Sequence, residues 1–210
     1  MSKNIKRWFD IFFAICVSVA VFPVIGLSML VVKICSPESP VIFKQVRIGY
    51  KGKPFTIYKL RTMTNECDEN GNLLPDEQRL KPWGRLIRKA SIDELTQIVH
   101  ILSGEMSWIG PRPLLPREML VMTKEERRER QSVMPGITGW EAVNEEKSDD
   151  RRTMAEYDLY YVRNWSLRLD VKIFFKTIEK LLVGDRSDEE HRAPKLKEEE
   201  LVSSSKKTGA

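Results

Sequence analysis

An uncharged apolar segment near the N-terminus constrains this chain more than any other feature. Residues 11–32 contain no Asp, Glu, Lys or Arg over 22 consecutive positions, and as a helix they would measure about 33 Å. That length is enough to cross the hydrocarbon core of a bilayer. A cleaved secretory signal fits poorly, because the run is too long and no small-x-small cleavage site follows it. We therefore expect a membrane segment.

Proline and the flanking charges argue against a simple transmembrane helix. Pro23 lies within the run, where a proline removes a backbone hydrogen bond and kinks a helix. Basic residues lie on both sides of the run, and the positive-inside rule then assigns both sides to the cytoplasm. We therefore expect residues 1–36 to form a re-entrant membrane segment broken at Phe22-Pro23, with a kinked single span as the alternative. The basic residues are Lys3, Lys6 and Arg7 before the run, and Lys33, Lys44, Arg47, Lys51 and Lys53 after it.

The sequence that follows predicts a mainly α-helical domain with a small β-hairpin over residues 37–184. Two β-rich stretches flank a turn region that contains Gly49 and Gly52, a pattern typical of a hairpin. A polar stretch with Asn-Gly and two prolines predicts a loop over residues 64–82. Apolar periodicity and helix-end signals predict four helices, with Gly104 closing the first of them. These helices are expected over residues 91–102, 117–131, 151–164 and 167–183.

The C-terminal residues 185–210 differ in composition and predict a disordered tail. They hold seven acidic and six basic residues and few large apolar ones, which is too little to build a core. Without them the chain has 29 bases and 23 acids, a net charge of +6. A basic body suits an anionic partner. Nucleic acid is not expected, because the basic residues alternate with acidic ones and no binding motif is present.

A pair of adjacent carboxylates, Asp93 and Glu94, begins the helix expected over residues 91–102, and two interpretations stand. Ser91 and Glu94 fit an S-x-x-E capping box, which is structural. Alternatively, the helix dipole keeps a carboxylate at this end ionised, as a nucleophile requires. Adjacent helical residues point about 100° apart, so one of the two carboxylates could attack a substrate while the other binds a metal ion.

Cationic residues around this pair favour the functional interpretation. Arg112 lies between two prolines, which restrict where its planar fork can point, and arginine forks suit phosphate groups. A Gly-Ile-Thr-Gly turn over residues 136–139 adds backbone groups. Together these residues predict a diphosphate site, although neither Walker A nor G-x-G-x-x-G occurs. The cationic residues are Lys59, Arg61, Arg85, Arg88, Lys89 and Arg112.

Taken in order, the motifs of residues 6–182 resemble the small monotopic phosphoglycosyl transferases. This is the bacterial sugar-transferase family that starts polyprenol-linked glycan assembly. The motifs are Lys6-Arg7 with Asp10, then residues 43–49, 59–63, 91–95, 110–113, 135–140 and 157–161.

The resemblance implies a fold, a membrane and a reaction. It implies a re-entrant helix broken near Pro23, with interfacial amphipathic helices that place the catalytic domain on the cytoplasmic face of the bacterial inner (plasma) membrane. It implies that a sugar 1-phosphate passes from a nucleotide sugar, expected to be a UDP-sugar, to polyprenol phosphate. The products are a polyprenyl-diphosphate sugar and UMP.

The resemblance also implies residue roles. Asp93 would be the nucleophile that forms a covalent phosphosugar intermediate, and Glu94, together with Asp93, would hold Mg²⁺. The substrate-binding residues it implies are Lys59, Arg61, Arg88, Arg112, Thr138 and Asp158.

The sequence departs from the family pattern near the proposed donor site. Met134 stands where the family usually has an arginine, and residues 141–146 replace its usual glutamine, glycine and arginine. Ala142, Glu145 and Glu146 are among the replacements, and acidic side chains there would repel a diphosphate if they faced the site. A non-catalytic adaptor that binds anionic lipid is therefore the alternative. The sugar, the nucleobase, the pathway, the polyprenol length and the oligomeric state stay open.

Overall fold

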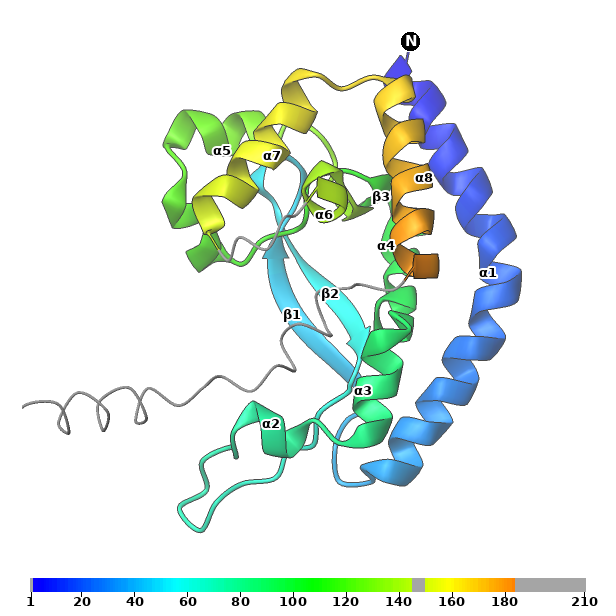
Figure 1. Cartoon of the computed structure of the whole chain (residues 1–210), viewed down its shortest axis with the longest axis vertical. Coiled ribbons are helices and arrows are strands. Elements are labelled where there is room, and N and C mark those ends of the chain that lie inside the picture. Colours follow the sequence, from blue (N-terminus) through cyan, green and yellow to red (C-terminus); the bar gives the residue numbers. More distant parts are fainter. Residues whose placement is uncertain (1, 145–149, 184–210) are drawn as a thin grey trace, which may run out of the picture.

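The computed structural model describes residues 2–144 and 150–183. The predicted tail over residues 185–210 lies outside this range, as do Glu145 and Glu146. The described chain is mostly helical and has two small sheets (Figure 1). The prediction of a mainly α-helical protein with a β-hairpin is confirmed.

The N-terminal helix α1, Ser2–Cys35, is continuous over 34 residues and contains Pro23. The predicted break at Phe22-Pro23 is therefore wrong. Instead, the helix curves as an arch whose two ends turn toward the rest of the molecule (Figure 1). A proline removes one hydrogen bond from a helix, and packing along one side of α1 supports the neighbouring turns, so that the helix bends without ending.

One face of α1 packs against the domain and the opposite face is exposed. Contacts run along the helix to β2 (Pro54–Leu60), α3 (Pro82–Lys89), the 3-10 helix η2 (Ile92–Gln97), α4 (Ile98–Ser103) and β3 (Ser107–Ile109). The outer face exposes large apolar side chains along the same length, and over Asn4–Cys35 the helix is long and apolar enough to span a membrane. The buried residues of the inner face are Asp10, Ala14, Ser18, Ile25, Ser28 and Val32.

Three polar residues near the start of α1 fasten it to the domain. Lys6 Nζ forms an ion pair with Asp170 Oδ2 at 2.7 Å. Arg7 Nη2 donates to the Ile101 carbonyl at 2.7 Å, next to the end of α4. Asp10 Oδ1 accepts from the Trp108 backbone N–H at 3.4 Å. The motif at residues 6–10 is therefore a tertiary anchor.

Strands β1, Ile42–Ile48, and β2, Pro54–Leu60, form the predicted antiparallel hairpin. The 3-10 helix η1, Tyr50–Gly52, joins them, and both Lys51 and Gly52 have positive φ there. Phe43 lies directly opposite Lys59. Because strand residues alternate between faces, Phe43, Gln45 and Arg47 share one face of the hairpin with Lys59.

The predicted loop over residues 64–82 contains helix α2, Asp76–Arg79, and leads into helix α3, Pro82–Lys89. Helix α3 was not predicted, because its eight residues are fewer than the about 11 over which apolar periodicity is assessed. Its first residue is Pro82, a position where proline is favoured. Gly84 allows α3 to approach Thr62 closely, since a Cβ at residue 84 would lie 1.9 Å from the Thr62 carbonyl oxygen.

The helix predicted over residues 91–102 is two shorter elements, η2, Ile92–Gln97, and α4, Ile98–Ser103. The predicted capping box is wrong: Ser91 adopts a left-handed conformation, with φ of 52°, and its side chain makes no capping hydrogen bond. This residue separates α3 from η2. Gly104 ends α4 with φ of 89°, as predicted.

The second half of the domain surrounds a short parallel pair, β3, Ser107–Ile109, and β4, Gly136–Thr138. The helix predicted over residues 117–131 is divided into η3, Pro116–Val121, and α5, Lys124–Arg130. Thr123 begins α5 with a capping box to Glu126, which explains the division. Helix α6, Trp140–Asn144, follows β4. The last two predicted helices are confirmed as α7, Arg151–Arg163, and α8, Leu167–Val183.

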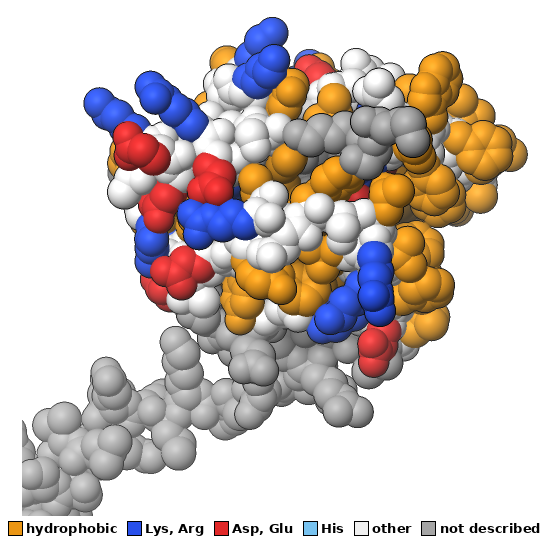
Figure 2. All heavy atoms as spheres, turned by 90° about the horizontal axis from the view of Figure 1, so that it is seen from above, with side chains coloured by type: hydrophobic (Ala, Val, Ile, Leu, Met, Phe, Trp, Pro, Cys, Tyr) orange, Lys and Arg blue, Asp and Glu red, His pale blue; other side chains and the backbone are white. Residues whose placement is uncertain are grey.

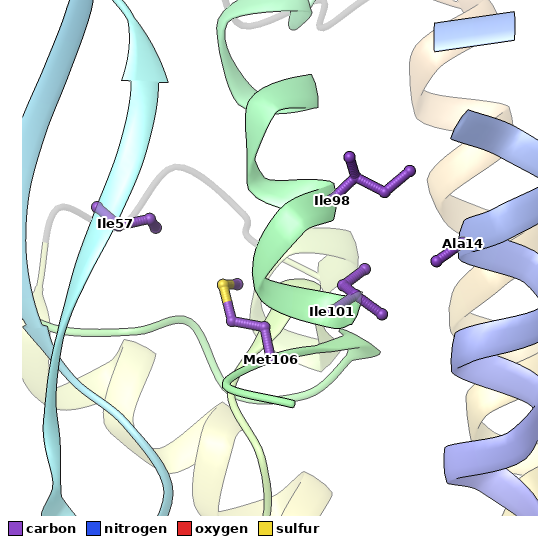
Figure 3. Close-up of a cluster of buried hydrophobic side chains, with 5 residues drawn as sticks. All are labelled: Ala14, Ile57, Ile98, Ile101 and Met106. Carbon is purple, nitrogen blue, oxygen red and sulfur yellow. The ribbon is translucent and has the colours of Figure 1, made fainter. Parts of the chain in front are cut away.

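The core joins α1 to the hairpin through α4. Ile98 and Ile101 of α4 point toward Ala14 of α1, with Ile57 and Met106 on the other side (Figure 3). Seen from above, apolar side chains gather on the side of α1, and acidic and basic ones on the side of α5 and α7 (Figure 2). Helix α8 adds an exposed apolar row to the first side. This row consists of Leu167, Val171, Phe175, Ile178, Leu181 and Leu182.

Candidate active site

A cavity of about 440 Å³ lies between the hairpin, α3 and η2. Asp93 and Glu94 lie in its wall, and five basic side chains share that wall with them. The structure places Lys59, Arg61 and Arg88, which the sequence grouped with the carboxylates, in this same wall. The lining residues are Phe43, Gln45, Arg47, Lys59, Leu60, Arg61, Thr62, Met63, Arg79, Arg88, Ser91, Asp93 and Glu94.

The carboxylate pair is held in place through the peptide groups of Tyr58. Thr96 Oγ1, from η2, donates to the Tyr58 carbonyl at 2.8 Å. The Tyr58 N–H donates to Nε2 of the buried His100 at 3.3 Å. His100 Nδ1 lies 2.7 Å from Glu105 Oε2, so the neutral ring must carry its proton on Nδ1. These bonds tie β2 to η2 and α4, and they bring Lys59 opposite the carboxylates.

Lys59 forms an ion pair with Glu94, through its Nζ and Glu94 Oε1. Burial raises the pKa of Asp93 above its ordinary value, the Lys59 charge opposes this rise, and the Glu94 charge adds to it. The sequence predicted that a helix dipole would keep Asp93 ionised. In the folded protein burial is the largest influence, and Asp93 depends on Lys59 and Arg88 to lower its pKa.

Arg88 and Arg61 flank the carboxylates from two elements. Arg88 lies in the last turn of α3, and its Nε donates to Thr62 Oγ1 at 2.8 Å. Arg61 follows β2, and it donates to the Pro40 carbonyl at 2.6 Å and to Asn65 Oδ1 at 2.8 Å. Both guanidinium groups are thus oriented by neutral acceptors, which leaves their charge uncompensated by those contacts and suited to an anion.

The cavity wall also contains Gln45, Arg47 and Arg79, which were not predicted as site residues. Arg47 Nη2 donates to Gln45 Oε1 at 2.6 Å, and Arg47 also forms an ion pair with Glu118 at 3.4 Å. Strand alternation combined with the hairpin register was the signal that could have identified Gln45 and Arg47, because both share a face with Lys59. Arg79 carried no such signal.

Arg112 lies beside the main cavity. It is exposed between two buried prolines, and it lines a smaller hollow together with Arg47, Lys59 and Glu94. Since the main cavity shares these three residues, Arg112 belongs to the same site.

Two residues assigned to substrate binding lie elsewhere. Thr138 is on β4, where its Oγ1 lies 2.8 Å from Thr177 Oγ1 of α8. Asp158 is only 3% exposed and forms an ion pair with Arg130. Neither lines the cavity. Their spacing from the other motifs gave no information on which side of β4 or α7 they would occupy.

The atypical residues that the structure describes also lie away from the carboxylates. Met134 lines a separate cavity near the start of α1. Glu141 is 6% exposed on α6, which packs against α7 and α8. The carbonyl of Ala142 accepts from Lys180 Nζ at 2.7 Å. Repulsion of a diphosphate by Glu141 is therefore not expected.

The carboxylate pair suits a magnesium ion that is bound together with substrate phosphates, and not a metal ion enclosed by protein ligands alone. Within residues 2–144 and 150–183, no cluster of three or more His, Cys, Asp and Glu side chains could enclose a metal. Mg²⁺ typically binds through one or two carboxylates together with substrate phosphates and water. Asp93 and Glu94, adjacent in the cavity wall, match that requirement.

Basic side chains dominate a cavity that holds a carboxylate pair, and an apolar helix of membrane-spanning length packs against the same domain. This combination suits a protein that binds phosphorylated ligands at a membrane surface. The chain belongs to the bacterial sugar transferase family, whose sequence model matches residues 1–184.

Relatives within this family carry related names. The chain is 48% identical to the uncharacterized sugar transferase EpsL of Bacillus subtilis (strain 168), over 86% of this chain and 89% of EpsL. It is 36% identical to the UDP-glucose:undecaprenyl-phosphate glucose-1-phosphate transferase of Escherichia coli (strain K12), over 88% of this chain and 41% of that protein. The identically named protein of Caulobacter vibrioides is 35% identical, over 87% of this chain and 71% of the relative. The chain thus spans nearly all of EpsL but less than half of the Escherichia coli protein.

Proposed function

We propose that this protein transfers a sugar 1-phosphate from a UDP-sugar to polyprenol phosphate, by way of a phosphosugar bound covalently to Asp93. The observation that carries the proposal is the position of Asp93 and Glu94, side by side in a cavity lined by Lys59, Arg61 and Arg88. The names of the relatives support the reaction class, since the Escherichia coli and Caulobacter proteins are named for this transfer with glucose.

The first step is an attack at phosphorus. A carboxylate oxygen of Asp93 forms a bond to the phosphorus that carries the sugar, and the bond from that phosphorus to the oxygen bridging to UMP breaks. The bridging oxygen keeps the electron pair, so UMP leaves as an anion. Arg88 and Arg61 stabilise the charge that develops on the phosphate oxygens, and Lys59 favours the ionised form of Asp93.

The second step regenerates the carboxylate. An oxygen of polyprenol phosphate attacks the same phosphorus, and the bond to Asp93 breaks with its electron pair returning to the carboxylate. The product is a polyprenyl-diphosphate sugar. Two displacements allow a water-soluble donor and a lipid acceptor to use one site in turn. Asp93 and Glu94 would hold Mg²⁺ together with donor phosphate oxygens, and the ion would offset the negative charge of the diphosphate.

We also propose a monotopic placement in the cytoplasmic leaflet of the bacterial plasma membrane. The convex side of α1 and the exposed row of α8 form an apolar surface, and both ends of the arch turn toward the domain (Figure 1). A helix that packs lengthwise against a charged domain cannot cross the bilayer in that arrangement, because charged groups would enter the hydrocarbon core. A shallow re-entrant path therefore accounts for α1 better than a span does.

Release of UMP tests the reaction. The purified full-length protein, mixed with a UDP-sugar and undecaprenyl phosphate, should release UMP only when Mg²⁺ is present. Asp93→Asn and Glu94→Gln should each reduce turnover by at least about a hundredfold. Glu156→Gln, at an exposed acid on α7, is the matched control.

Retention of label tests the intermediate. With a sugar-labelled donor and no acceptor, the wild-type protein should keep label through denaturation and Asp93→Asn should not. Full turnover by Asp93→Asn would contradict the nucleophile assignment, and turnover without labelled protein would contradict the covalent step. Cysteines placed at residues 4 and 51 should both react from the cytoplasmic side, whereas labelling from opposite sides would establish a membrane span.

A further inference from the structure

We propose that Arg130, a buried residue at the end of α5, is a positioning residue that holds Arg112 in place for the donor diphosphate. The inference rests on the proposed function and adds a residue that does not line the cavity. Arg130 is 3% exposed. Its Nε and Nη2 donate to Asp158 Oδ2 at 2.9 and 2.6 Å, and the same Nη2 donates to the carbonyl of Arg112.

Each carbonyl of the Pro111-Arg112-Pro113 segment accepts a hydrogen bond from a different element. The Pro111 carbonyl accepts from the Gly136 N–H of β4 at 3.0 Å. The Pro113 carbonyl accepts from Arg47 Nη1 of β1 at 3.2 Å. Arg130 supplies the third bond, from α5. The two prolines fix their own φ angles, so the backbone at residue 112 is constrained both by its covalent structure and by three donors.

The side chain of Arg112 remains available to a ligand. Its guanidinium has no hydrogen-bond partner among the residues that the structure describes, although Arg112 lines the hollow with Lys59 and Glu94. An arginine loses conformational entropy when it binds a phosphate, and a preorganised backbone reduces that loss. Arg130 thereby improves the ability of Arg112 to bind a diphosphate without touching the ligand.

Asp158 compensates the buried charge of Arg130 and orients its guanidinium group. An unpaired buried guanidinium would be strongly destabilising. Both hydrogen bonds from Arg130 to Asp158 go to Oδ2. Asp158 lies on α7, so the pair connects α5 and α7 to the segment that carries Arg112. The structure assigns to Asp158 a role behind the site, where the sequence predicted contact with substrate.

A double-mutant cycle tests the inference in the full-length protein. Arg130→Lys keeps a positive charge beside Asp158, but a lysine cannot reproduce the planar fork that also reaches the Arg112 carbonyl. We expect kcat/KM for UMP release to fall about tenfold or more, since small errors of placement are costly. In an Arg112→Ala background the same change should have little further effect. In an Arg88→Ala background it should have its full effect, because Arg88 is oriented by Thr62.

Calorimetric binding of UDP supplies a second measurement that does not need turnover. Arg130→Lys should weaken UDP binding when Arg112 is present and not in Arg112→Ala. Thermal melting should show that each variant is folded. If Arg130→Lys does not fold, the Arg130→Leu/Asp158→Leu variant removes both buried charges together and leaves neither unpaired. It should show the same dependence on Arg112.

The outcomes separate this inference from the proposed function. A wild-type protein that binds UDP without releasing UMP would refute the reaction, whereas coupling between residues 130 and 112 in UDP binding would still support the inference. Equal losses in the Arg112→Ala and Arg88→Ala backgrounds, in turnover and in binding, would overturn it. A wild-type protein that binds no UDP would overturn it as well.

Discussion

Gly84→Ala should damage the site from a position outside the cavity wall. Gly84 lies on α3 four residues before Arg88, on the same face of the helix. A Cβ there would lie 1.9 Å from the carbonyl oxygen of Thr62, whereas ordinary contact begins at 3.4 Å. Helix α3 and Thr62 must therefore separate by about 1.5 Å. The bond from Arg88 Nε to Thr62 Oγ1, now 2.8 Å, cannot survive a shift of that size.

Both stability and activity should fall. Overpacking of this kind costs about 1–3 kcal/mol of folding free energy. Replacing glycine by alanine within a helix gains about 1 kcal/mol. At the upper end of the overpacking range the cost exceeds this gain, and the protein is destabilised. Because Arg88 moves with α3, kcat/KM for UMP release should fall by about ten- to a hundredfold. Steady-state kinetics at saturating acceptor, together with a melting curve, measure the two effects.

Gly26→Ala is the matched control for this experiment. Gly26 is also a helical glycine, but nothing lies within 4 Å of a Cβ built there. Its replacement should leave turnover unchanged and stabilise α1 slightly. Wild-type activity in Gly84→Ala, with Gly26→Ala equally active, would refute the argument that close approach of α3 to Thr62 positions Arg88.

Three further perturbations address charge, burial and the membrane face. Lys59→Met removes a cation that lowers the pKa of Asp93, so this pKa should rise. The acidic limb of the kcat/KM–pH profile should then move to higher pH. An unmoved limb would count against Asp93 as the group that must be ionised. Asp158→Ala leaves Arg130 buried without its partner and should lower the free energy of unfolding by about 3–5 kcal/mol, measured by chemical denaturation. A decrease below about 1 kcal/mol would contradict a buried ion pair. Phe175→Asp introduces a charge into the exposed row of α8 and should weaken sedimentation with liposomes while leaving the melting curve unchanged; undiminished binding would remove α8 from the membrane surface.

Local patterns were sufficient for the hairpin and for the last two helices. The β-rich stretches on either side of Gly49 and Gly52 predicted β1 and β2, which pair as expected. Apolar periodicity predicted α7 and α8 to within one residue at each end. In each case the signal lies within one element, so that no distant contact was needed to interpret it.

Local patterns failed where a distant contact decided the backbone. Ser91 and Glu94 match a capping box, yet Ser91 is left-handed and its side chain makes no capping hydrogen bond. Pro23 predicts a break, yet α1 continues. Helix α3 was missed for another reason, because its eight residues are fewer than the about 11 over which apolar periodicity is assessed.

The site shows the same division. Motif order brought together Asp93, Glu94, Lys59, Arg61 and Arg88, and the cavity contains all five. The same reasoning placed Asp158 with them, although its charge is directed to a buried arginine that no motif singled out.

The sequence by itself determined the chemical groups of this protein: an apolar helix, adjacent carboxylates and the basic residues to accompany them. These follow from residue type and short-range spacing. Only the tertiary structure decided that α1 bends without breaking, that burial opposes the ionisation of Asp93, and that Arg130 holds the backbone of Arg112. Each of these depends on contacts between residues far apart along the chain, and on the low polarity that such contacts create around a charge.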